Sequence, residues 1–284
     1  MPTKRFEMHM KKLVEHYCDL PGMWRPALWR IWHDVLNTLD SEIDKVFLNY
    51  GYASPNGEFD DLVLEARDEP DRFGIQLYQH VTKGMSITGA SVLEVGCGRG
   101  GGASFLARYR KPKEYVALDI SKRLVARCNR KHQVPGLTFV SGTAERLPFA
   151  PVRFDAVVNI ESARCYGDIG AFFREAHRVL RPNGLFFFAD MVKNKDVEPT
   201  RMLLQNTGFD IIRHKDIRQN VVLALQQDAA ARKKVIDDRV PVWLRQAFYE
   251  FAGVEGSRRF RAFFDNSMQY NSYVLRKQAT NTSA

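Results

Sequence analysis

The feature that most constrains this chain is an apolar run that ends in a cluster of glycines, at residues 92–102. The run Ser91–Val95 has the character of a buried strand, and the residues after the glycines can begin a helix. Glycines between a strand and a helix let the backbone turn tightly and approach a ligand closely, which a Cβ atom would prevent. Gly96, Gly98 and Gly101 fit the spacing G-x-G-x-x-G, so the sequence predicts a nucleotide-binding turn.

Two acidic residues indicate which nucleotide this turn binds. Asp119 closes the next apolar run, Tyr115–Leu118, at the distance a βαβ unit requires, and an acid there can accept hydrogen bonds from both ribose hydroxyls. Glu94 stands beside the glycines, where a carboxylate would repel the pyrophosphate of a dinucleotide. It suits a ligand that has an ammonium group and no phosphate, and S-adenosylmethionine is such a ligand.

Strand-like and helix-like segments alternate downstream of this turn. Further strands are expected at Leu137–Val140, Phe154–Ile160 and Leu185–Ala189, with a helix over Ile169–Leu180. Alternation of this kind predicts a parallel sheet, with ligands bound outside the carboxyl ends of the strands.

In order and spacing these segments resemble the motifs of class I S-adenosylmethionine-dependent methyltransferases, over about residues 88–192. The motifs are Val92–Gly98, Tyr115–Asp119, Gly142–Phe149, Phe154–Tyr166 and Ala176–Asp190. The resemblance implies an α/β fold, with a doubly wound, Rossmann-like sheet of seven strands. Met268–Leu275 is then the last strand, which runs antiparallel in this fold.

Less specific motifs resemble bacterial small-molecule and lipid methyltransferases of the phthiotriolone/phenolphthiotriolone dimycocerosates type. They are Phe47–Tyr52, Glu69-Pro70, Gly101–Ser104, Cys165-Tyr166 and Phe251–Gly256. With 19 Phe, 10 Tyr and 4 Trp in the chain, we expect a largely apolar pocket and a hydrophobic, natural-product or lipid-like substrate.

The resemblance also implies a set of cofactor-binding residues. Glu94 and the backbone of Gly96 and Gly98 should face the methionyl ammonium, with Asp119 on the ribose. Related enzymes often have an acid after Gly142, where this chain has Thr143 instead. The predicted set is Tyr52, Glu94, Gly96, Gly98, Asp119, Ile120, Thr143, Ala144, Glu145 and Glu161.

Aromatic residues near the N-terminus allow two interpretations. Tyr50 and Tyr52 lie where related enzymes fold an aromatic segment over the cofactor, and a Tyr ring near a sulfonium gains cation–π stabilisation. Packing in the core explains the same residues equally well. Tyr78 has the same two interpretations.

The catalytic residues are expected at the ends of two strands. Relatives commonly have a histidine after the position of Glu161, but residues 162–166 contain none. Glu161 or Asp190 could act as the general base if apolar surroundings raised its pKa, or could instead position the substrate or the cofactor. Arg164 could bind an anionic group of the substrate. His177 is interpreted as structural, and His80 as a weaker candidate that could point to the site.

The missing histidine keeps several reactions open. O-methylation is the predicted reaction. Methylation of a prenyl or aromatic carbon needs no strong base, and a cofactor-binding protein of this fold could also catalyse a cyclisation. A non-catalytic cofactor-binding subunit is the alternative from another functional class.

The remaining sequence suggests additions around one methyltransferase domain. Helical patterns in residues 1–54 predict a lid, with a possible homo-oligomer contact, and residues 55–277 form the domain. Residues 218–265 exceed a simple crossover and are interpreted as an inserted helical cap, while residues 278–284 are expected to be a disordered tail. Residues 55–70 are expected to be a mobile connection.

Charge and composition indicate which kinds of binding partner to expect. The net charge of +9 is uneven, because residues 201–284 have 14 Lys and Arg against 8 Asp and Glu. A solvated basic face explains this surplus, as would an anionic substrate group or acidic lipid heads. No nucleic-acid module, apolar run of membrane-spanning length or secretory signal is evident. The cysteines show no metal-ligand spacing. We expect a cytoplasmic enzyme that has no metal.

Overall fold

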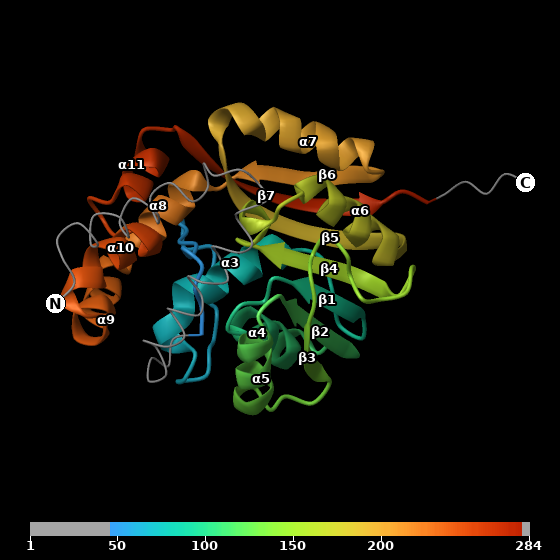
Figure 1. Ribbon diagram of the computed structural model, residues 1–284, viewed down its shortest axis with the longest axis horizontal. Helices are drawn as coiled ribbons and strands as arrows, with labels where there is room; N and C mark the ends of the chain where they lie inside the picture. The colour runs from blue at the N-terminus through green and yellow to red at the C-terminus, as the bar shows by residue number, and fades with distance from the viewer. Residues whose placement is uncertain (1–45, 280–284) are drawn as a thin grey trace, which may run out of the picture.

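Figure 1 shows the computed structural model, which describes residues 46–279 of the chain. Its centre is a sheet of seven strands in the order β3-β2-β1-β4-β5-β7-β6, and β7 is antiparallel to both of its neighbours. The predicted doubly wound, seven-stranded sheet is confirmed. The strands are β1 (Ser91–Val95), β2 (Glu114–Asp119), β3 (Leu137–Ser141), β4 (Phe154–Ile160), β5 (Leu180–Lys193), β6 (Phe209–Asp216) and β7 (Met268–Lys277).

Helices connect these strands and cover both faces of the sheet (Figure 1). The α-helices are α3 (Arg72–Thr82), α4 (Gly101–Arg110), α5 (Lys122–Lys131), α6 (Ile169–Val179), α7 (Val197–Asn206), α8 (Arg218–Gln227), α9 (Ala229–Arg239), α10 (Val242–Ala252) and α11 (Arg258–Phe264). Short 3₁₀ helices are η2 (Glu69–Asp71), η3 (Ala163–Cys165) and η4 (Asn194–Asp196).

The apolar runs form central strands because both faces of the sheet are covered. Every residue of β1 is buried, and alternate residues enter two different hydrophobic clusters. Val92 belongs to a cluster that also contains side chains of α3, α4, α8 and α11, whereas Leu93 and Val95 belong to a cluster that contains side chains of α6 and α7.

The position of the site follows from the strand order. Strand β1 pairs in parallel with β2 on one side and with β4 on the other, so the chain continues from β1 in one direction and from β4 in the opposite one. This reversal opens a crevice at the carboxyl ends of β1 and β4, which is where ligands bind in doubly wound sheets.

Strand β5 is longer than predicted and includes Asp190. The sequence predicted a strand over Leu185–Ala189 with Asp190 just after its end, but β5 continues to Lys193. The extension occurs because antiparallel pairing with β7 supplies hydrogen-bond partners beyond Ala189, with Asp190 opposite Asn271.

Residues 218–265 contain four helices, α8 to α11, which gather at one end of the sheet, on the left of Figure 1. Asp228 separates α8 from α9, and Pro241 precedes α10. Helices α9 and α10 share a small apolar cluster that includes Ile236, Leu244 and Phe248. Val221 of α8 and Phe263 of α11 instead enter the main core.

Residues 1–45 and 280–284 lie outside the described residues, as do almost all of the predicted lid and its oligomer contact. Gln278, the first residue of the predicted tail, donates its backbone N–H to the carbonyl of Gly208 over 3.1 Å. Near the end of residues 55–70, which were predicted to be a mobile connection, Asp68 accepts two hydrogen bonds from Arg108, over 2.7 and 2.8 Å.

Candidate functional site

A cleft lies at the carboxyl ends of β1 and β4, as the strand order requires. It has a volume of about 970 Å³, counted out to open solvent. Its walls come from the glycine turn after β1, the ends of β2 and β4, the turn after β3, the segment before α3, and parts of η3 and α10. Lining residues from these parts include Val46–Asn49, Gly96–Arg99, Asp119, Ile120, Gly142, Ala144, Glu145, Glu161, Arg164 and Phe251.

The glycine turn has the two properties that the sequence predicted. Gly96 has a φ of +76°, and a Cβ atom there would lie 2.2 Å from Oγ of Ser162, so a larger residue would break the turn. Gly98 has a φ of +54° and lines the cleft, but a Cβ atom on it would meet no atom within 4 Å. The backbone of Gly98 therefore faces open space that a ligand can occupy closely.

Asp119 lies at the end of β2 and lines the same cleft. Its oxygens accept the backbone N–H groups of Gly98 and Ser121, each over 2.9 Å. These bonds fix the carboxylate against the glycine turn while leaving each oxygen further acceptor capacity. Burial raises the pKa of Asp119 to about 6.

Glu94 does not line the cleft, contrary to the expectation that it faces the ligand directly. Its side chain points into the core below the turn, where one oxygen accepts the hydroxyl of Tyr78 and the other the hydroxyl of Tyr115, each over 2.8 Å. Tyr78 lines the cleft and so lies between Glu94 and the space for a ligand. Gly102 makes room for this ring, because a Cβ atom there would be 1.9 Å from it.

Burial raises the pKa of Glu94 to about 7, although both tyrosine hydroxyls oppose this by stabilising the carboxylate. The charge of nearby Asp119 raises it further. Glu94 is thus a buried acid whose charge depends on pH near neutrality, and a cation bound in the cleft would favour its ionised form.

The turn after β3 contributes two of its three predicted positions, Ala144 and Glu145, to the cleft. Gly142, Ala144 and Glu145 line the cleft together with Ile120. Thr143 does not, because its side chain is exposed and the residue pairs with Arg146 across the turn. The structure therefore does not bring Thr143 to the cleft.

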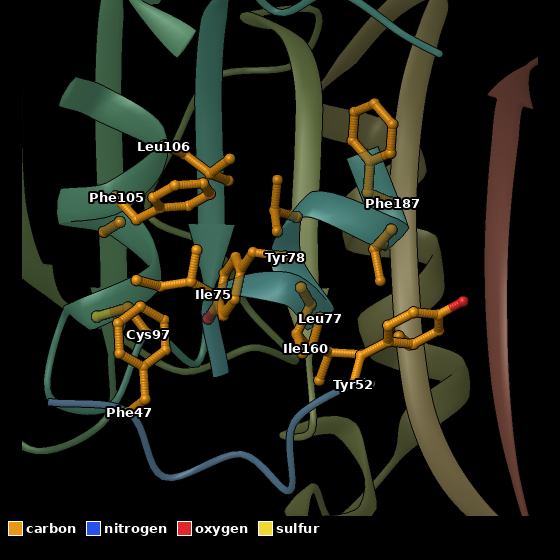
Figure 2. Close-up of a cluster of buried hydrophobic side chains, with 14 of the residues drawn as sticks. Phe47, Tyr52, Ile75, Leu77, Tyr78, Cys97, Phe105, Leu106, Ile160 and Phe187 are labelled. Carbon is orange, nitrogen blue, oxygen red and sulfur yellow. The ribbon is translucent and has the colours of Figure 1, made fainter. Parts of the chain in front are cut away.

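Tyr52 is also placed away from the cleft. Its ring stacks on His80 at 4.3 Å between centroids, and its hydroxyl donates to Glu58 over 2.7 Å. Figure 2 shows the ring pointing away from Phe47, Tyr78 and Cys97. For Tyr52 the alternative interpretation, packing in the core, therefore applies. Its backbone N–H donates to the carbonyl of Phe73 at the start of α3, which holds the residue in this position.

The segment before α3 still covers the cleft, but with other residues. Phe47, Leu48 and Asn49 line it, whereas the ring of Tyr50 is buried beside it. The hydroxyl of Tyr50 donates to the carbonyl of Phe251, over 3.0 Å.

Glu161 follows β4 and lines the cleft with an unusual backbone. Its φ is +54°, a left-handed conformation that non-glycine residues rarely adopt and that is common in strained functional sites. Oε1 accepts the backbone N–H of Tyr50 over 2.8 Å and the hydroxyl of Tyr270 over 2.9 Å. Oε2 is buried and accepts no hydrogen bond from any residue in the range 46–279. Burial raises the pKa of Glu161, against the opposing charge of Arg164.

Asp190 lies behind Arg164 and does not line the cleft, contrary to its prediction as a possible base. One oxygen accepts from Nη1 of Arg164 over 2.9 Å and from the N–H of Met191 over 2.8 Å, and the other accepts the N–H of Arg164 over 3.0 Å. Asp190 was predicted near the reacting atoms because the strand was expected to end before it. Inside β5 its side chain turns to η3 instead.

Comparison with known proteins identifies the family. Residues 93–188 match a family described as a methyltransferase domain. The phthiotriol/phenolphthiotriol dimycocerosates methyltransferase of Mycobacterium tuberculosis is 35% identical over 250 residues, which cover 88% of this chain and 92% of that protein. The chain belongs to the S-adenosylmethionine-dependent methyltransferases. S-adenosylmethionine is therefore the cofactor of this methyltransferase.

Other similar proteins act on different molecules. A fatty-acid O-methyltransferase of Mycolicibacterium smegmatis is 36% identical over 238 residues, or 83% of this chain and 85% of that one. Among solved structures, a geranyl diphosphate C-methyltransferase from Streptomyces coelicolor A3(2) has a TM-score of 0.61 at 14% identity, with 86% of this chain and 97% of that chain covered. This structural likeness shows the fold of the methyltransferase alone.

Three side chains of the methyltransferase site were missed or left undecided by the sequence. Tyr270 in β7 binds Glu161, and no local motif marks it, because it reaches the site only through the pairing of β7 with β5. Tyr78 had two interpretations, the core or the cofactor site; it packs against Gly102 and lines the cleft. Arg99, the third of these side chains, is buried and lines the cleft.

The two histidines considered in the sequence lie away from the cleft. His80 is buried against Tyr52, and this burial lowers its pKa to about 4. The ring of His177 packs at 5.3 Å from that of Phe209, as expected for a structural residue.

Within residues 46–279, no helix combines the length and the apolar character of a membrane-spanning segment. No three His, Cys, Asp or Glu side chains in residues 46–279 are arranged to hold a metal ion.

Proposed function

We propose that this methyltransferase methylates an uncharged hydroxyl group of a hydrophobic, lipid-like molecule, with Glu161 as the general base. The observation that carries the proposal is the geometry of the Glu161 carboxylate. Oε1 is held by two donors, whereas Oε2 accepts no hydrogen bond from residues 46–279 and lies 3.6 Å from Nη2 of Arg164.

The part of the cleft that contains Asp119 and Gly98, away from Glu161, suits the cofactor. Asp119 offers carboxylate oxygens to the ribose hydroxyls, and the backbone of Gly98 faces the open space. Ala144 and Ile120 supply apolar contacts suited to an adenine ring. The buried Glu94, through Tyr78, provides negative charge near the methionyl ammonium.

S-adenosylmethionine supplies a methyl group on a positively charged sulfur, which is already a good leaving group. The protein therefore has to align the acceptor and remove its proton. In our proposal the acceptor proton passes to Oε2 of Glu161 as the hydroxyl oxygen forms its bond to the methyl carbon. A raised pKa suits this role, because a base with a pKa nearer to neutrality takes up the proton more readily.

Arg164 argues against an anionic acceptor. Its guanidinium lies 2.9 Å from Asp190 and 3.6 Å from Glu161, so two carboxylates compensate its single charge. A carboxylate substrate would bring a third negative charge to this end of the cleft, and it would need no base. An uncharged hydroxyl needs the base and avoids the repulsion.

The walls near Glu161 favour an apolar acceptor. Ile160, Phe47, Leu48 and Phe251 line the cleft and offer hydrocarbon surface. The names of the two mycobacterial relatives, a dimycocerosates and a fatty-acid methyltransferase, also indicate lipid-like acceptors.

The direct test compares three acceptors with the purified full chain and S-adenosylmethionine: a long-chain secondary alcohol, the corresponding fatty acid and a prenyl alcohol. We expect S-adenosylhomocysteine release and a methyl ether with the secondary alcohol. Mass spectrometry and carbon NMR of the product locate the methyl group. A methyl ester from the fatty acid alone, or a new carbon–carbon bond in the prenyl product, would contradict the proposal.

Cofactor binding can be tested separately by calorimetry. Asp119→Ala removes the predicted acceptor for the ribose and should weaken S-adenosylmethionine binding by about tenfold to a hundredfold, as expected for hydrogen bonds to a charged group. Thr143→Ala is the matched control in the neighbouring turn, and its affinity should equal that of the wild type. Equal affinities of all three proteins would show that the ribose binds elsewhere.

A further inference from the structure

We propose that Arg232, in helix α9, is a positioning residue for methyl transfer. It holds the backbone of residues 49–50, so that the N–H of Tyr50 fixes the Glu161 carboxylate. This inference rests on the proposed role of Glu161 as base. It assigns a function to a residue of the segment 218–265 that does not itself line the cleft.

Arg232 is buried and joins three parts of the chain. Its Nε donates to Oδ2 of Asp228 over 2.7 Å, within the same insertion. Its Nη2 donates to the carbonyls of Asn49 and Tyr50, over 3.3 and 3.1 Å. Its Nη1 lies 3.4 Å from the carbonyl of Ala252, at the end of α10. A rigid guanidinium can bind all of these acceptors at once, which an ammonium group cannot.

Tyr50 transmits this contact to the site. Its backbone N–H donates to Oε1 of Glu161 over 2.8 Å. Its hydroxyl is held by two further elements, since it donates to the carbonyl of Phe251 and accepts from Nη1 of Arg259, each over 3.0 Å. Both ends of Tyr50 are therefore fixed by residues of the insertion.

The segment needs such support because it belongs to no helix or strand. Residues 49 and 50 are buried, and a buried carbonyl without a donor is costly. Gly51 follows with a φ of +85°, and a Cβ atom there would be 2.8 Å from Cβ of Phe73, so the chain turns sharply at this point. Arg232 binds the two carbonyls immediately before this turn.

Four groups face the Glu161 carboxylate, one from each element packed against it. They are Arg164 from η3, Asp190 from β5, Tyr270 from β7 and the N–H of Tyr50. The Tyr50 bond lowers the pKa of Glu161, so its loss should raise that pKa. The low-pH limb of the kcat profile should then move to higher pH.

The test uses Arg232→Met in the full chain, with Arg245→Met as the matched control. Arg245 also donates to backbone carbonyls, those of Val240 and Asp237, but these contacts stay inside the insertion. Arg232→Met should lower kcat by about tenfold to a hundredfold, as expected when a reacting group is misplaced. It should change the KM for the acceptor little and move the low-pH limb upward, whereas Arg245→Met should do neither.

Hydrogen exchange gives a readout that does not depend on turnover. In the protein without cofactor, Arg232→Met should speed exchange of the Tyr50 amide, and Arg245→Met should leave it unchanged. If circular dichroism shows that Arg232→Met is unfolded, Arg232→Lys replaces it. Lysine keeps the charge opposite Asp228 but has a single nitrogen, so the same effects are expected in smaller size.

Combination with Glu161→Gln separates this inference from the proposed function. If Arg232 acts through Glu161, its replacement should lower kcat no further in the Glu161→Gln background. A wild-type kcat, pH profile and exchange rate in the folded Arg232 variant, beside an inactive Glu161→Gln protein, would overturn the positioning role alone. Full activity of Glu161→Gln would overturn the base itself, and with it the positioning role.

Discussion

Two buried glutamates of this methyltransferase, Glu94 and Glu161, are bound in different ways. Glu94 lies within β1 and Glu161 directly follows β4, and burial raises the pKa of each. Glu94 has one tyrosine hydroxyl on each oxygen. Glu161 has both of its donors on Oε1, while Oε2 accepts no hydrogen bond from residues 46–279.

The difference shows how one residue type can serve two purposes in a single cleft. A carboxylate with a donor on each oxygen is held in place and acts through its charge. A carboxylate held by one oxygen is oriented as firmly, but its other oxygen can take up a proton. The distribution of donors, more than burial or strand position, separates the two roles.

The largest expected effect is on turnover. Glu161→Gln removes the proposed base and should lower kcat by about a hundredfold to ten thousandfold, the usual contribution of general base catalysis. Its affinity for S-adenosylmethionine should stay within a few-fold of wild type. Steady-state kinetics and calorimetry measure the two quantities.

Glu94→Gln is the counterpart, and at saturating cofactor it should keep most of its kcat while binding the cofactor less tightly. If both variants lost turnover equally at saturation, the contrast between the two glutamates would be false.

The next effect is on stability. Burial raises the pKa of Glu94 to about 7 from an ordinary value of 4.5. Because the folded protein holds this proton more tightly than the unfolded chain, the contribution of Glu94 is complete below about pH 4.5 and is lost as the pH rises through about 7. Urea denaturation without cofactor should show the wild type losing about 3 kcal/mol relative to Glu94→Gln between pH 4.5 and 8. Saturating S-adenosylmethionine should reduce this loss.

If the stability of the wild type and of Glu94→Gln changed with pH in parallel, the pKa of Glu94 would be the same in the folded and the unfolded protein. This outcome would contradict the effect of burial on Glu94.

The smallest expected effects are those of replacing Tyr78 or Tyr52. Tyr78→Phe leaves one oxygen of Glu94 without its donor and should destabilise the protein by about 1–3 kcal/mol and weaken cofactor binding several-fold. Tyr52→Phe loses a hydrogen bond to Glu58, outside the cleft, and should cost about 1 kcal/mol with unchanged cofactor affinity. Thermal melts and calorimetry distinguish them. Weaker cofactor binding by Tyr52→Phe would contradict this and would mean that Tyr52 contributes to the cofactor site.

Several parts of the site could be predicted because they depend on short stretches of chain. Gly96, Gly98 and Asp119 line the cleft as expected, since a strand, a turn and the end of the next strand determine their positions. Thr143 and Tyr52 were predicted by their position in a segment, and neither lines the cleft, although neighbours in both segments do. Asp190 lies behind Arg164 because strand β5 extends past the predicted end.

By itself the sequence determined the alternation of strands and helices and the methyl donor, because these follow from apolar periodicity and from motifs a few residues long. The tertiary structure decided which donors bind each carboxylate. Tyr50 and Tyr270, which hold Glu161, are 111 and 109 residues away from it along the chain. Such contacts depend on how distant elements pack, and side-chain packing at that range leaves no local pattern in the sequence.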